Sequence, residues 1–171
     1  MGGATDTTVF ILAGGKSTRM GTDKAFVEYE GRTLLVRALD LAHSITSEVR
    51  IVGNKDKFAA FAAVVEDVFR DCGPLGGIHA ALRAAPTDLN LMLAIDTPFI
   101  SSAFLQYLLS QARSAPEAIA IVPRSAASWQ PLCAIYRKEF ATIAENALRA
   151  QQYKIGRLFE KVPTRVIEPE E

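Results

Sequence analysis

The stretch TVFILAGGKSTRMGTDKA, residues 8–25, decides the fold class, because it carries an apolar run straight into a glycine-rich loop. The run at 8–13 is short and apolar, which is typical of a strand buried on both faces. Gly14 and Gly15 follow directly, and Gly21 comes later in the same loop. A loop in this position, after the first strand of an open α/β sheet, is a common place for a phosphate-bearing ligand.

The loop imitates two familiar phosphate-binding patterns without matching either. Gly15-Lys16-Ser17 has the ending of the ATPase pattern G-x-x-x-x-G-K-[ST], but Phe10 stands where that pattern needs its first glycine. The dinucleotide pattern G-x-G-x-x-G fails too, because the glycines are wrongly spaced. Glycines still let the backbone approach phosphate closely, and Lys16, Arg19 and Lys24 can neutralise several phosphate oxygens. The residues therefore favour a triphosphate ligand over a merely solvated turn.

The composition is balanced and shows no bias toward a polyanionic partner. Of 171 residues, 49% are hydrophobic, and 19 basic side chains offset 19 acidic ones. This balance gives no electrostatic reason to bind nucleic acid or an anionic membrane, so a small-molecule partner is expected. The N-terminus lacks a signal-peptide pattern and no apolar stretch approaches ~20 residues, which predicts a cytoplasmic protein. Cys72 and Cys133 have no metal-binding or redox spacing and are expected to be free thiols.

Short apolar runs alternate with amphipathic helical patterns along the chain. Strands are predicted at 8–13, 49–53, 63–67, 89–95, 118–122 and 131–137. Helices are predicted at 33–44, 55–63, 76–85, 102–113, 138–150 and 155–161. This alternation predicts a three-layer α/β/α domain built on a mostly parallel, twisted sheet.

Three polar residues follow predicted strands, and open α/β sheets bind ligands outside the carboxyl ends of their strands. These residues are Asn54, Asp67 and Asp96. Asp96 ends a nearly continuous apolar run, and a carboxylate there suits Mg²⁺, which takes one or two carboxylates along with phosphate oxygens and water. The alternative role for Asp96 is to cap the next helix, for which Ser101 and Ser102 are better placed. For Asp67 the alternative to a ligand contact is a structural role, in which its carboxylate accepts hydrogen bonds from loop N–H groups.

Four ordered motifs resemble those of a known family. The first is LAGGKSTRMGTDK (12–24), and GPLGGIHAAL (73–82), LAIDTPFIS (93–101) and QPLCAIYR (130–137) follow in order. On these motifs the chain resembles the molybdenum cofactor guanylyltransferases, which are MobA-like nucleotidyltransferases. The resemblance implies a Rossmann-like fold of the glycosyltransferase-A-like type. It also implies transfer of GMP from GTP to molybdopterin bearing molybdenum, with release of pyrophosphate.

The resemblance further implies roles for particular residues. Lys24 and Arg19 match cations that contact the nucleotide phosphates, and Asp96 matches the aspartate that holds Mg²⁺, so these three are the implied catalytic residues. The implied nucleotide-binding residues are Leu12, Ala13, Gly14, Gly15, Lys24, Asn54, Asp67 and Asp96.

The acceptor half of the site has less support in the sequence. The family usually closes with a strand and helix carrying N-x-N-T-P-E-[DE], whereas this sequence ends at VIEPEE. The prediction is a single nucleotidyltransferase domain over 1–171, with that closing element either cut off or lost. Trp129 lies near the expected acceptor side, or fills a gap in the core. His43 and His79 form no catalytic set and are expected to be surface or helix residues.

Two other functions remain open at this point. A nucleotidyltransferase of this fold could use CTP, or a different phosphate or alcohol as acceptor. A non-catalytic protein could deliver or sense the cofactor, although the intact Lys24, Asp67 and Asp96 argue against it. The expected substrates are GTP and the molybdopterin cofactor, the expected protein partners are molybdoenzymes or other cofactor-biosynthesis proteins, and neither nucleic acid nor membrane is expected as a partner.

Overall fold

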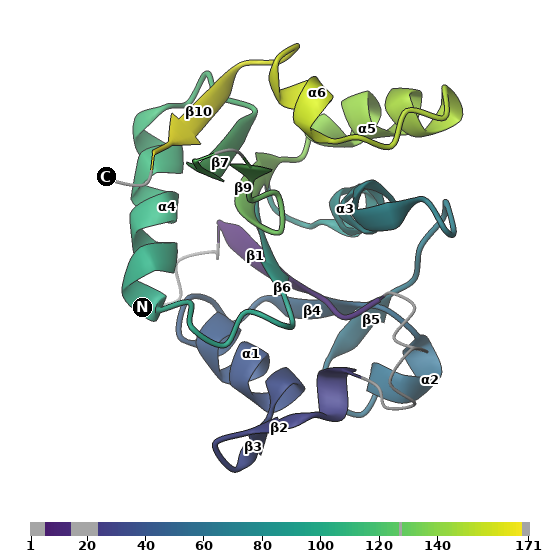
Figure 1. Ribbon diagram of the computed structural model, residues 1–171, viewed down its shortest axis with the longest axis vertical. Helices are drawn as coiled ribbons and strands as arrows, with labels where there is room; N and C mark the ends of the chain where they lie inside the picture. The colour runs from purple at the N-terminus through teal and green to yellow at the C-terminus, as the bar shows by residue number, and fades with distance from the viewer. Residues whose placement is uncertain (1–5, 15–23, 127, 169–171) are drawn as a thin grey trace.

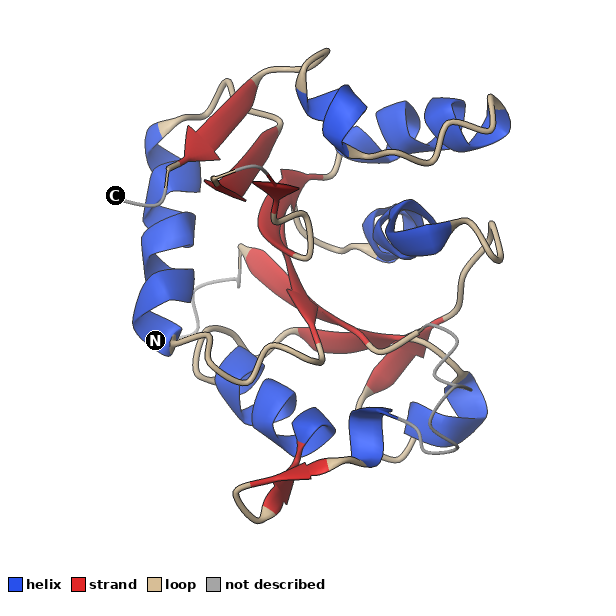
Figure 2. Cartoon of the chain, in the orientation of Figure 1, coloured by secondary structure: helices blue, strands red, loops and turns tan. Residues whose placement is uncertain are grey.

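A twisted central sheet divides the computed structural model, and helices cover both of its faces (Figures 1 and 2). The structure describes residues 6–14, 24–126 and 128–168. Sheet and helices form the three-layer α/β arrangement that the alternating sequence predicts.

Most neighbouring strands of the central sheet run parallel. Its strands are β1 (Thr7–Leu12), β4 (Val49–Val52), β5 (Ala63–Val65), β6 (Leu89–Ala94), β7 (Ala120–Ser125), β8 (Ser128–Trp129), β9 (Cys133–Arg137) and β10 (Thr164–Ile167). Their order is β10-β7-β9-β6-β1-β4-β5, and β8 pairs with β7. β1 pairs in parallel with β4 and β6, whereas β9 runs antiparallel between β6 and β7. The prediction of a mostly parallel sheet is confirmed.

Each face of the sheet has its own set of helices. One face packs against α1 (Leu34–His43), α2 (Lys55–Phe58) and α4 (Ser102–Ser114). The other face packs against α3 (Gly73–Ala84), α5 (Phe140–Arg149) and α6 (Gly156–Phe159). Within the described ranges, no helix combines the length and the apolar character that crossing a membrane requires.

The two inner strands supply side chains to both hydrophobic layers because successive residues of a strand point to opposite faces. Val9 and Ile11 of β1 lie in the layer under α1 and α4, whereas Phe10 between them lies in the layer under α3 and α5. In β6, Leu91 faces the first layer and Met92 the second. This two-sided burial explains why both strands appear in the sequence as continuous apolar runs.

Two helix boundaries differ from the prediction by more than two residues. The helix expected at 55–63 ends at Phe58, where a turn follows in which the Phe61 N–H donates to the Phe58 carbonyl at 2.9 Å. The helix expected at 76–85 begins earlier, at Gly73. Gly73 has a φ of +66°, which favours glycine, and Pro74 is pre-shaped for the first turn of a helix.

Three short or late strand elements escape the sequence prediction. β8 and β10 are two of them, and the third is a hairpin of β2 (Glu28–Tyr29) and β3 (Arg32–Thr33). The hairpin turn has φ values of +51° at Glu30 and +81° at Gly31, as a tight two-residue turn requires. Strands of two residues are too short to show any periodicity in the sequence.

The strand order reverses beside β1. The chain passes from β1 outward to β4 and β5, and then returns to form β6 on the opposite side of β1. The carboxyl ends of β1, β4 and β6 therefore meet at one edge of the sheet, where loops diverge and leave a crevice. This reversal places the loops after the three strands around a common space.

Candidate functional site

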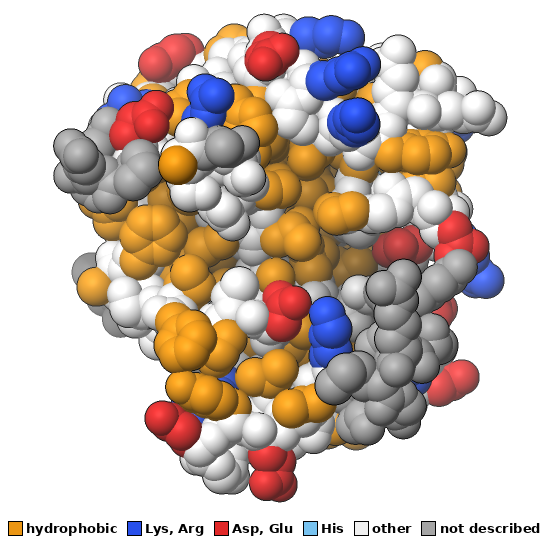
Figure 3. All heavy atoms as spheres, viewed as in Figure 1, with side chains coloured by type: hydrophobic (Ala, Val, Ile, Leu, Met, Phe, Trp, Pro, Cys, Tyr) orange, Lys and Arg blue, Asp and Glu red, His pale blue; other side chains and the backbone are white. Residues whose placement is uncertain are grey.

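A cavity of about 900 Å³ opens at the carboxyl edge of the sheet. Its walls come from the ends of the inner strands, from the start of α3 and from the segment that leads into α3. Figure 3 looks onto this side of the molecule, where hydrophobic side chains gather across the middle and charged side chains lie mainly around them. The lining residues that the sequence had already indicated are Leu12, Ala13, Gly14, Lys24, Asn54, Asp67 and Asp96.

The end of β1 presents backbone to this cavity. The Ala13 N–H donates to the Val52 carbonyl at 2.9 Å, and the Ile95 N–H donates to the Leu12 carbonyl at 3.3 Å. These bonds fix the strand end between its two neighbours. A Cβ built on Gly14 would come no closer than 3.9 Å to the Val52 carbonyl oxygen, so the fold itself does not demand glycine there. Absence of a side chain at Gly14 leaves its backbone open to a ligand.

Lys24 and Asp96 face each other at the cavity wall. The Lys24 Nζ lies 3.7 Å from Asp96 Oδ2, and both side chains are more than half exposed. Lys24 opens a single 3-10 turn, η2 (Lys24–Phe26), which is anchored by the buried Ala25 and by stacking of Phe26 on Phe58 with ring centroids 6.0 Å apart. An exposed pair of this kind contributes little to stability, so both groups can exchange partners when an anionic ligand enters.

Asp96 is free of the capping role that was its alternative. Ser101 caps α4 instead, because its Oγ accepts a hydrogen bond from the Phe104 N–H at 3.1 Å. Asp96 comes two residues after the end of β6, in the turn that Thr97 stabilises by donating to the Ala94 carbonyl at 2.8 Å. The Asp96 carboxylate therefore projects from the end of a buried central strand, and its ion pair with Lys24 is a side-chain contact at the cavity.

Asp67 is half-buried against the first turns of α3. Burial raises the pKa of its carboxyl group above the ordinary value of 3.8, and the charges of Arg70 and His79 only partly offset this. A Cβ placed on Gly76 or Gly77 would lie 3.9 Å from an oxygen of the Asp67 carboxylate. The carboxylate thus lies beside a bare stretch of helix backbone, where it can accept hydrogen bonds from a ligand.

Glycine occupies three positions at the start of α3, and the physical reason for glycine differs among them. Gly73 has a positive φ, and a Cβ on Gly76 would come within 2.7 Å of the Phe69 carbonyl oxygen. Both are required by the folded backbone. A Cβ on Gly77 would make only ordinary contacts, 3.6 Å to Leu12 and 3.7 Å to Val52. Gly77 lines the cavity, so a ligand rather than the fold explains the missing side chain there.

Asn54 has a structural role as well as a place in the cavity wall. Its Oδ1 accepts a hydrogen bond from the Lys57 N–H at 3.2 Å and so caps α2. Substituting Asn54 would therefore disturb the start of α2 together with any ligand contact.

Two of the sequence-predicted site residues, Gly15 and Arg19, lie outside the described residues, as does Lys16. Other cavity residues were missed by the sequence prediction. Arg70 and Asp71 lie shortly before the GPLGG motif, and the proximity of that motif was the available signal. Further lining residues that were missed are Val52, Ala94, Ile95 and Leu132.

His79 lies on a helix, as expected, and its side chain is fully buried between α3 and α5. Its Nε2 lies 3.0 Å from Glu145 Oε1, while its Nδ1 has no hydrogen-bond partner within the described part of the chain. The hydrogen bond with His79 lowers the pKa of the Glu145 carboxyl, helped by Arg83 and Arg149. His79 also meets the Phe69 ring edge to face at 5.1 Å, which fastens the Asp67–Cys72 segment to α3.

Trp129, whose role the sequence left open, packs against α6. Its ring centroid lies 5.0 Å from that of Phe159, and a Cβ on Gly156 would come within 2.9 Å of its Cδ1. Arg124 covers the ring at 4.9 Å. These contacts favour the packing role. Cys72 and Cys133 are both free thiols, as expected.

The donor chemistry of the cavity is compatible with a magnesium ion. Asp96 supplies an exposed carboxylate oxygen, which is the hard donor that Mg²⁺ prefers. Among the described residues, no three His, Cys, Asp or Glu side chains converge as a metal site. Mg²⁺ at Asp96 would therefore depend on phosphate oxygens and water for its remaining ligands, as is usual for this ion at nucleotides.

The doubly wound sheet with a nucleotide-sized cavity at its carboxyl edge defines an α/β domain of the nucleotide-binding class. Comparison with known proteins makes this class more specific. The chain belongs to the MobA-like NTP transferase domain family, whose sequence model matches residues 9–166.

Individual relatives agree with the family assignment. The chain is 33% identical over 165 residues to a probable molybdenum cofactor guanylyltransferase of Flavobacterium johnsoniae, covering 96% of this chain and 86% of that protein. The crystal structure of molybdopterin-guanine dinucleotide biosynthesis protein A from Archaeoglobus fulgidus superposes on the chain with a TM-score of 0.81 at 27% sequence identity. The match covers 95% of this chain and 84% of that protein.

A more distant structure shows the fold alone. The chain is 14% identical to CMP:2-keto-3-deoxy-manno-octonic acid synthetase in complex with CTP, with a TM-score of 0.75 and coverage of 96% and 90%. The fold is therefore that of the nucleotidyltransferases, as the sequence motifs implied.

Proposed function

We propose that this chain, as one nucleotidyltransferase domain, transfers GMP from GTP to the phosphate of a molybdopterin-type cofactor and releases pyrophosphate. The observation that carries the proposal is the convergence of Leu12, Lys24, Asp67 and Asp96 on one cavity, although they are far apart in the sequence. The cavity is within the roughly 300–1,000 Å³ typical of small-molecule sites. The relative from Flavobacterium johnsoniae is named for this activity, and its similarity to this chain extends over most of both proteins.

In the proposed complex the nucleoside lies between the end of β1 and the start of α3. The backbone of Ala13 and Gly14 faces it on one side, and Gly77 lets it approach on the other. Asp67 accepts hydrogen bonds from N–H or O–H donors of the base or ribose. The phosphates extend from there toward Lys24, whose ammonium group is the described cation nearest to Asp96.

The proposed reaction is an in-line displacement at the α-phosphorus. An oxygen of the acceptor phosphate forms the new bond to phosphorus, and the bond between the α-phosphorus and the bridging oxygen breaks with its electron pair leaving on pyrophosphate. The acceptor is already anionic, so the chain need not supply a strong general base. Its contribution is to position the two substrates and to neutralise charge, which Lys24 does at the phosphates.

Asp96 is the proposed ligand of Mg²⁺. When bound, this ion would neutralise phosphate oxygens and act as a Lewis acid toward them. The Lys24 ammonium group then has to move from Asp96 to the nucleotide phosphates. Since the 3.7 Å pair is solvent-exposed, that exchange costs little. Delivery of the product to molybdoenzymes or other cofactor-biosynthesis proteins is a further part of the proposal.

Thermal unfolding with added nucleotides tests the proposal. A ligand present at about 100 times its Kd stabilises the folded state by ~2.7 kcal/mol, which raises the Tm of a chain of this size by roughly 5–10 °C. We expect this rise with GTP and Mg²⁺, and a clearly smaller one with CTP or ATP. Equal stabilisation by all three nucleotides, or preference for CTP, would contradict the proposed use of GTP. Stabilisation without any turnover would instead favour a non-catalytic binding protein.

A further inference from the structure

Phe99 is unusually exposed for an aromatic side chain beside a candidate active site. It lies in the loop between β6 and α4, three residues after Asp96, and its exposed fraction is 82%. This is the highest value among the large hydrophobic side chains of the described residues. Burial of a large apolar side chain stabilises the fold, so its exposure to water needs a reason other than stability.

The exposed ring is held by a rigid neighbour. The ring of Tyr29, on the β2–β3 hairpin, meets Phe99 edge to face with centroids 5.7 Å apart and planes at 81°. The Arg37 guanidinium covers the Tyr29 ring at 4.9 Å. Its Nε donates to the Tyr29 carbonyl at 2.8 Å, and its Nη2 pairs with Glu30 Oε2 at 3.3 Å. The α1 helix and the hairpin thus fix Tyr29, and Tyr29 orients Phe99.

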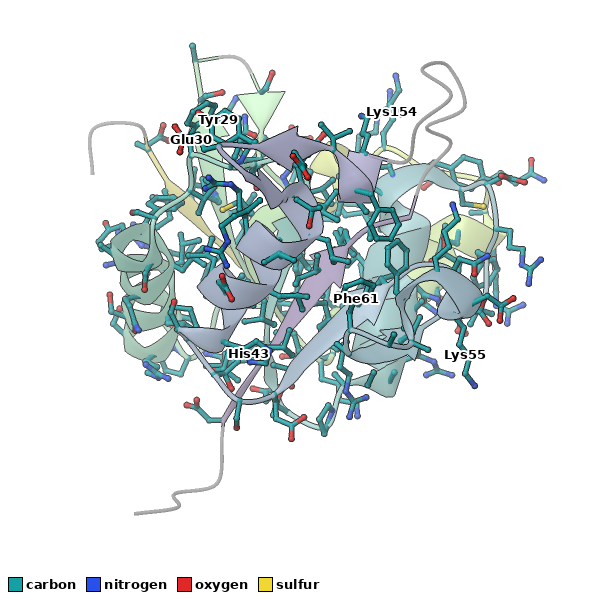
Figure 4. The ribbon with its side chains drawn as sticks, turned by 90° about the horizontal axis from the view of Figure 1, so that it is seen from below. Tyr29, Glu30, His43, Lys55, Phe61 and Lys154 are labelled. Carbon is teal, nitrogen blue, oxygen red and sulfur yellow. The ribbon has the colours of Figure 1, made fainter. Side chains whose placement is uncertain are left out.

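The two rings lie outside the wall of the nucleotide cavity. Phe99 is not part of the nucleotide cavity wall, whereas Asp96 is. A second, smaller cavity of about 140 Å³ lies under this loop, and it shares Ala94 and Ile95 with the first. In Figure 4 the inner strands run upward, and Tyr29 and Glu30 lie at the upper edge, which is the carboxyl edge. Three extended residues span at most ~10 Å, so a molecule whose phosphate is at Asp96 can reach Phe99.

We propose that Phe99, oriented by Tyr29, is the platform on which the planar pterin ring of the acceptor stacks. This inference rests on the proposed function, because it assigns the acceptor of that reaction to the face of Phe99. A pterin is a flat heteroaromatic ring like a nucleobase, and such rings stack on exposed aromatic side chains with useful affinity. Stacking fixes the plane of the ring, and the phosphate of the acceptor is then carried toward Asp96 and Lys24.

Phe61 is another exposed aromatic side chain, in a different part of the fold. Phe61 is 43% exposed, but it belongs to a separate cluster in which Phe26 contacts both Phe61 and Phe58. Figure 4 shows Phe61 away from Tyr29, below the carboxyl edge. Phe61 therefore offers a matched control for the removal of an exposed aromatic ring.

The test measures transfer kinetics with molybdopterin as the varied substrate and GTP at saturation. Phe99→Leu keeps an apolar side chain and removes the aromatic face, so we expect the KM for molybdopterin to rise about tenfold or more with kcat within about twofold. The Kd for GTP should stay unchanged. Phe99→Tyr keeps a flat ring and should restore the wild-type KM, and Phe61→Leu should leave the KM for molybdopterin within about twofold of the wild type.

The outcomes separate this inference from the proposed function. If the wild-type protein makes no guanine dinucleotide product, the proposed function itself fails. If the wild type is active but Phe99→Leu has an unchanged KM for molybdopterin, the platform is wrong while the function stands. An equal loss of GTP affinity in Phe99→Leu would also overturn the platform. So would a change in oligomeric state with unchanged kinetics, because Phe99 would then belong to an interface between copies.

Discussion

Gly77→Ala should stabilise the protein and weaken nucleotide binding at the same time. In the folded chain the added methyl group would lie 3.6 Å from Leu12 Cδ2 and 3.7 Å from Val52 Cγ1, which are ordinary contacts. Alanine in place of glycine within a helix stabilises by about 0.5–1 kcal/mol. For a chain of this size we therefore expect the Tm to rise by about 1–4 °C.

The same methyl group stands in the way of the nucleotide. Gly77 lines the cavity between the end of β1 and Asp67, so a base or ribose packed against its Cα would be displaced by more than 1 Å, roughly the length of a carbon–carbon bond. Misplacement of that size costs contacts over the whole ring, and we expect the Kd for GTP to rise about tenfold or more. Calorimetric titration with GTP and Mg²⁺ measures this directly.

Gly76→Ala is the matched control, because it differs by one position and has the opposite effect on stability. Its methyl group would lie 2.7 Å from the backbone carbonyl oxygen of Phe69, a contact that the structure must relieve by strain. Overpacking of this kind costs about 1–3 kcal/mol, so the Tm should fall. If Gly77→Ala binds GTP within twofold of the wild type, the nucleotide does not pack on α3 and the placement is wrong.

Three further predictions concern polar and charged side chains of the site and its support. Lys24→Ala and Asp96→Asn should each lower the turnover of GTP at least 100-fold. The Tm of each variant should stay within about 2 °C of the wild-type Tm, because the ion pair between the two side chains is exposed. Near-normal pyrophosphate release by either variant contradicts the role proposed for the substituted residue. Burial raises the pKa of Asp67, so its charged form costs stability at neutral pH and that cost fades as pH falls through the raised pKa toward 3.8. The Tm of Asp67→Asn should therefore equal or exceed the wild-type Tm at pH 7, and the difference between the two Tm values should shrink toward pH 4. A variant Tm that is below the wild-type Tm at pH 7 and stays below it at pH 4 counts against this. His79→Ala should lower the Tm by roughly 5–10 °C because it opens a cavity and removes the partner of Glu145, and an unchanged Tm argues against a buried supporting role.

The sequence predicts the layers of the fold because hydrophobic periodicity reports burial directly. Phe10 and Met92 are buried on one face of the sheet, and their neighbours in the strands are buried on the other face. Because both faces are covered, the inner strands appear in the sequence as continuous apolar runs. The two-residue strands of the hairpin carry no such periodicity, and only the Glu30-Gly31 turn signals them. Boundaries set by turn geometry, such as the start of α3 at Gly73, escape for a similar reason.

The candidate site is predictable where its residues follow strands, and less so elsewhere. Asp67 and Asp96 stand at strand ends, and parallel strands bring their ends to one edge, so their convergence follows from the topology. Burial of His79 does not follow from its helix pattern, because its partner Glu145 comes from a helix 66 residues later in the chain. Phe99 is exposed in a loop, and no periodic pattern describes a loop.

Product analysis tests the central claim most directly. The protein is incubated with Mg²⁺, molybdenum-loaded molybdopterin and one nucleoside triphosphate at a time, and the dinucleotide product and pyrophosphate are measured by mass spectrometry and an enzymatic assay. The account predicts the guanine dinucleotide of the cofactor with GTP, one pyrophosphate for each product molecule, and at least tenfold less product with CTP or ATP. Preferential formation of a cytosine dinucleotide, or binding of GTP with no product, would contradict it.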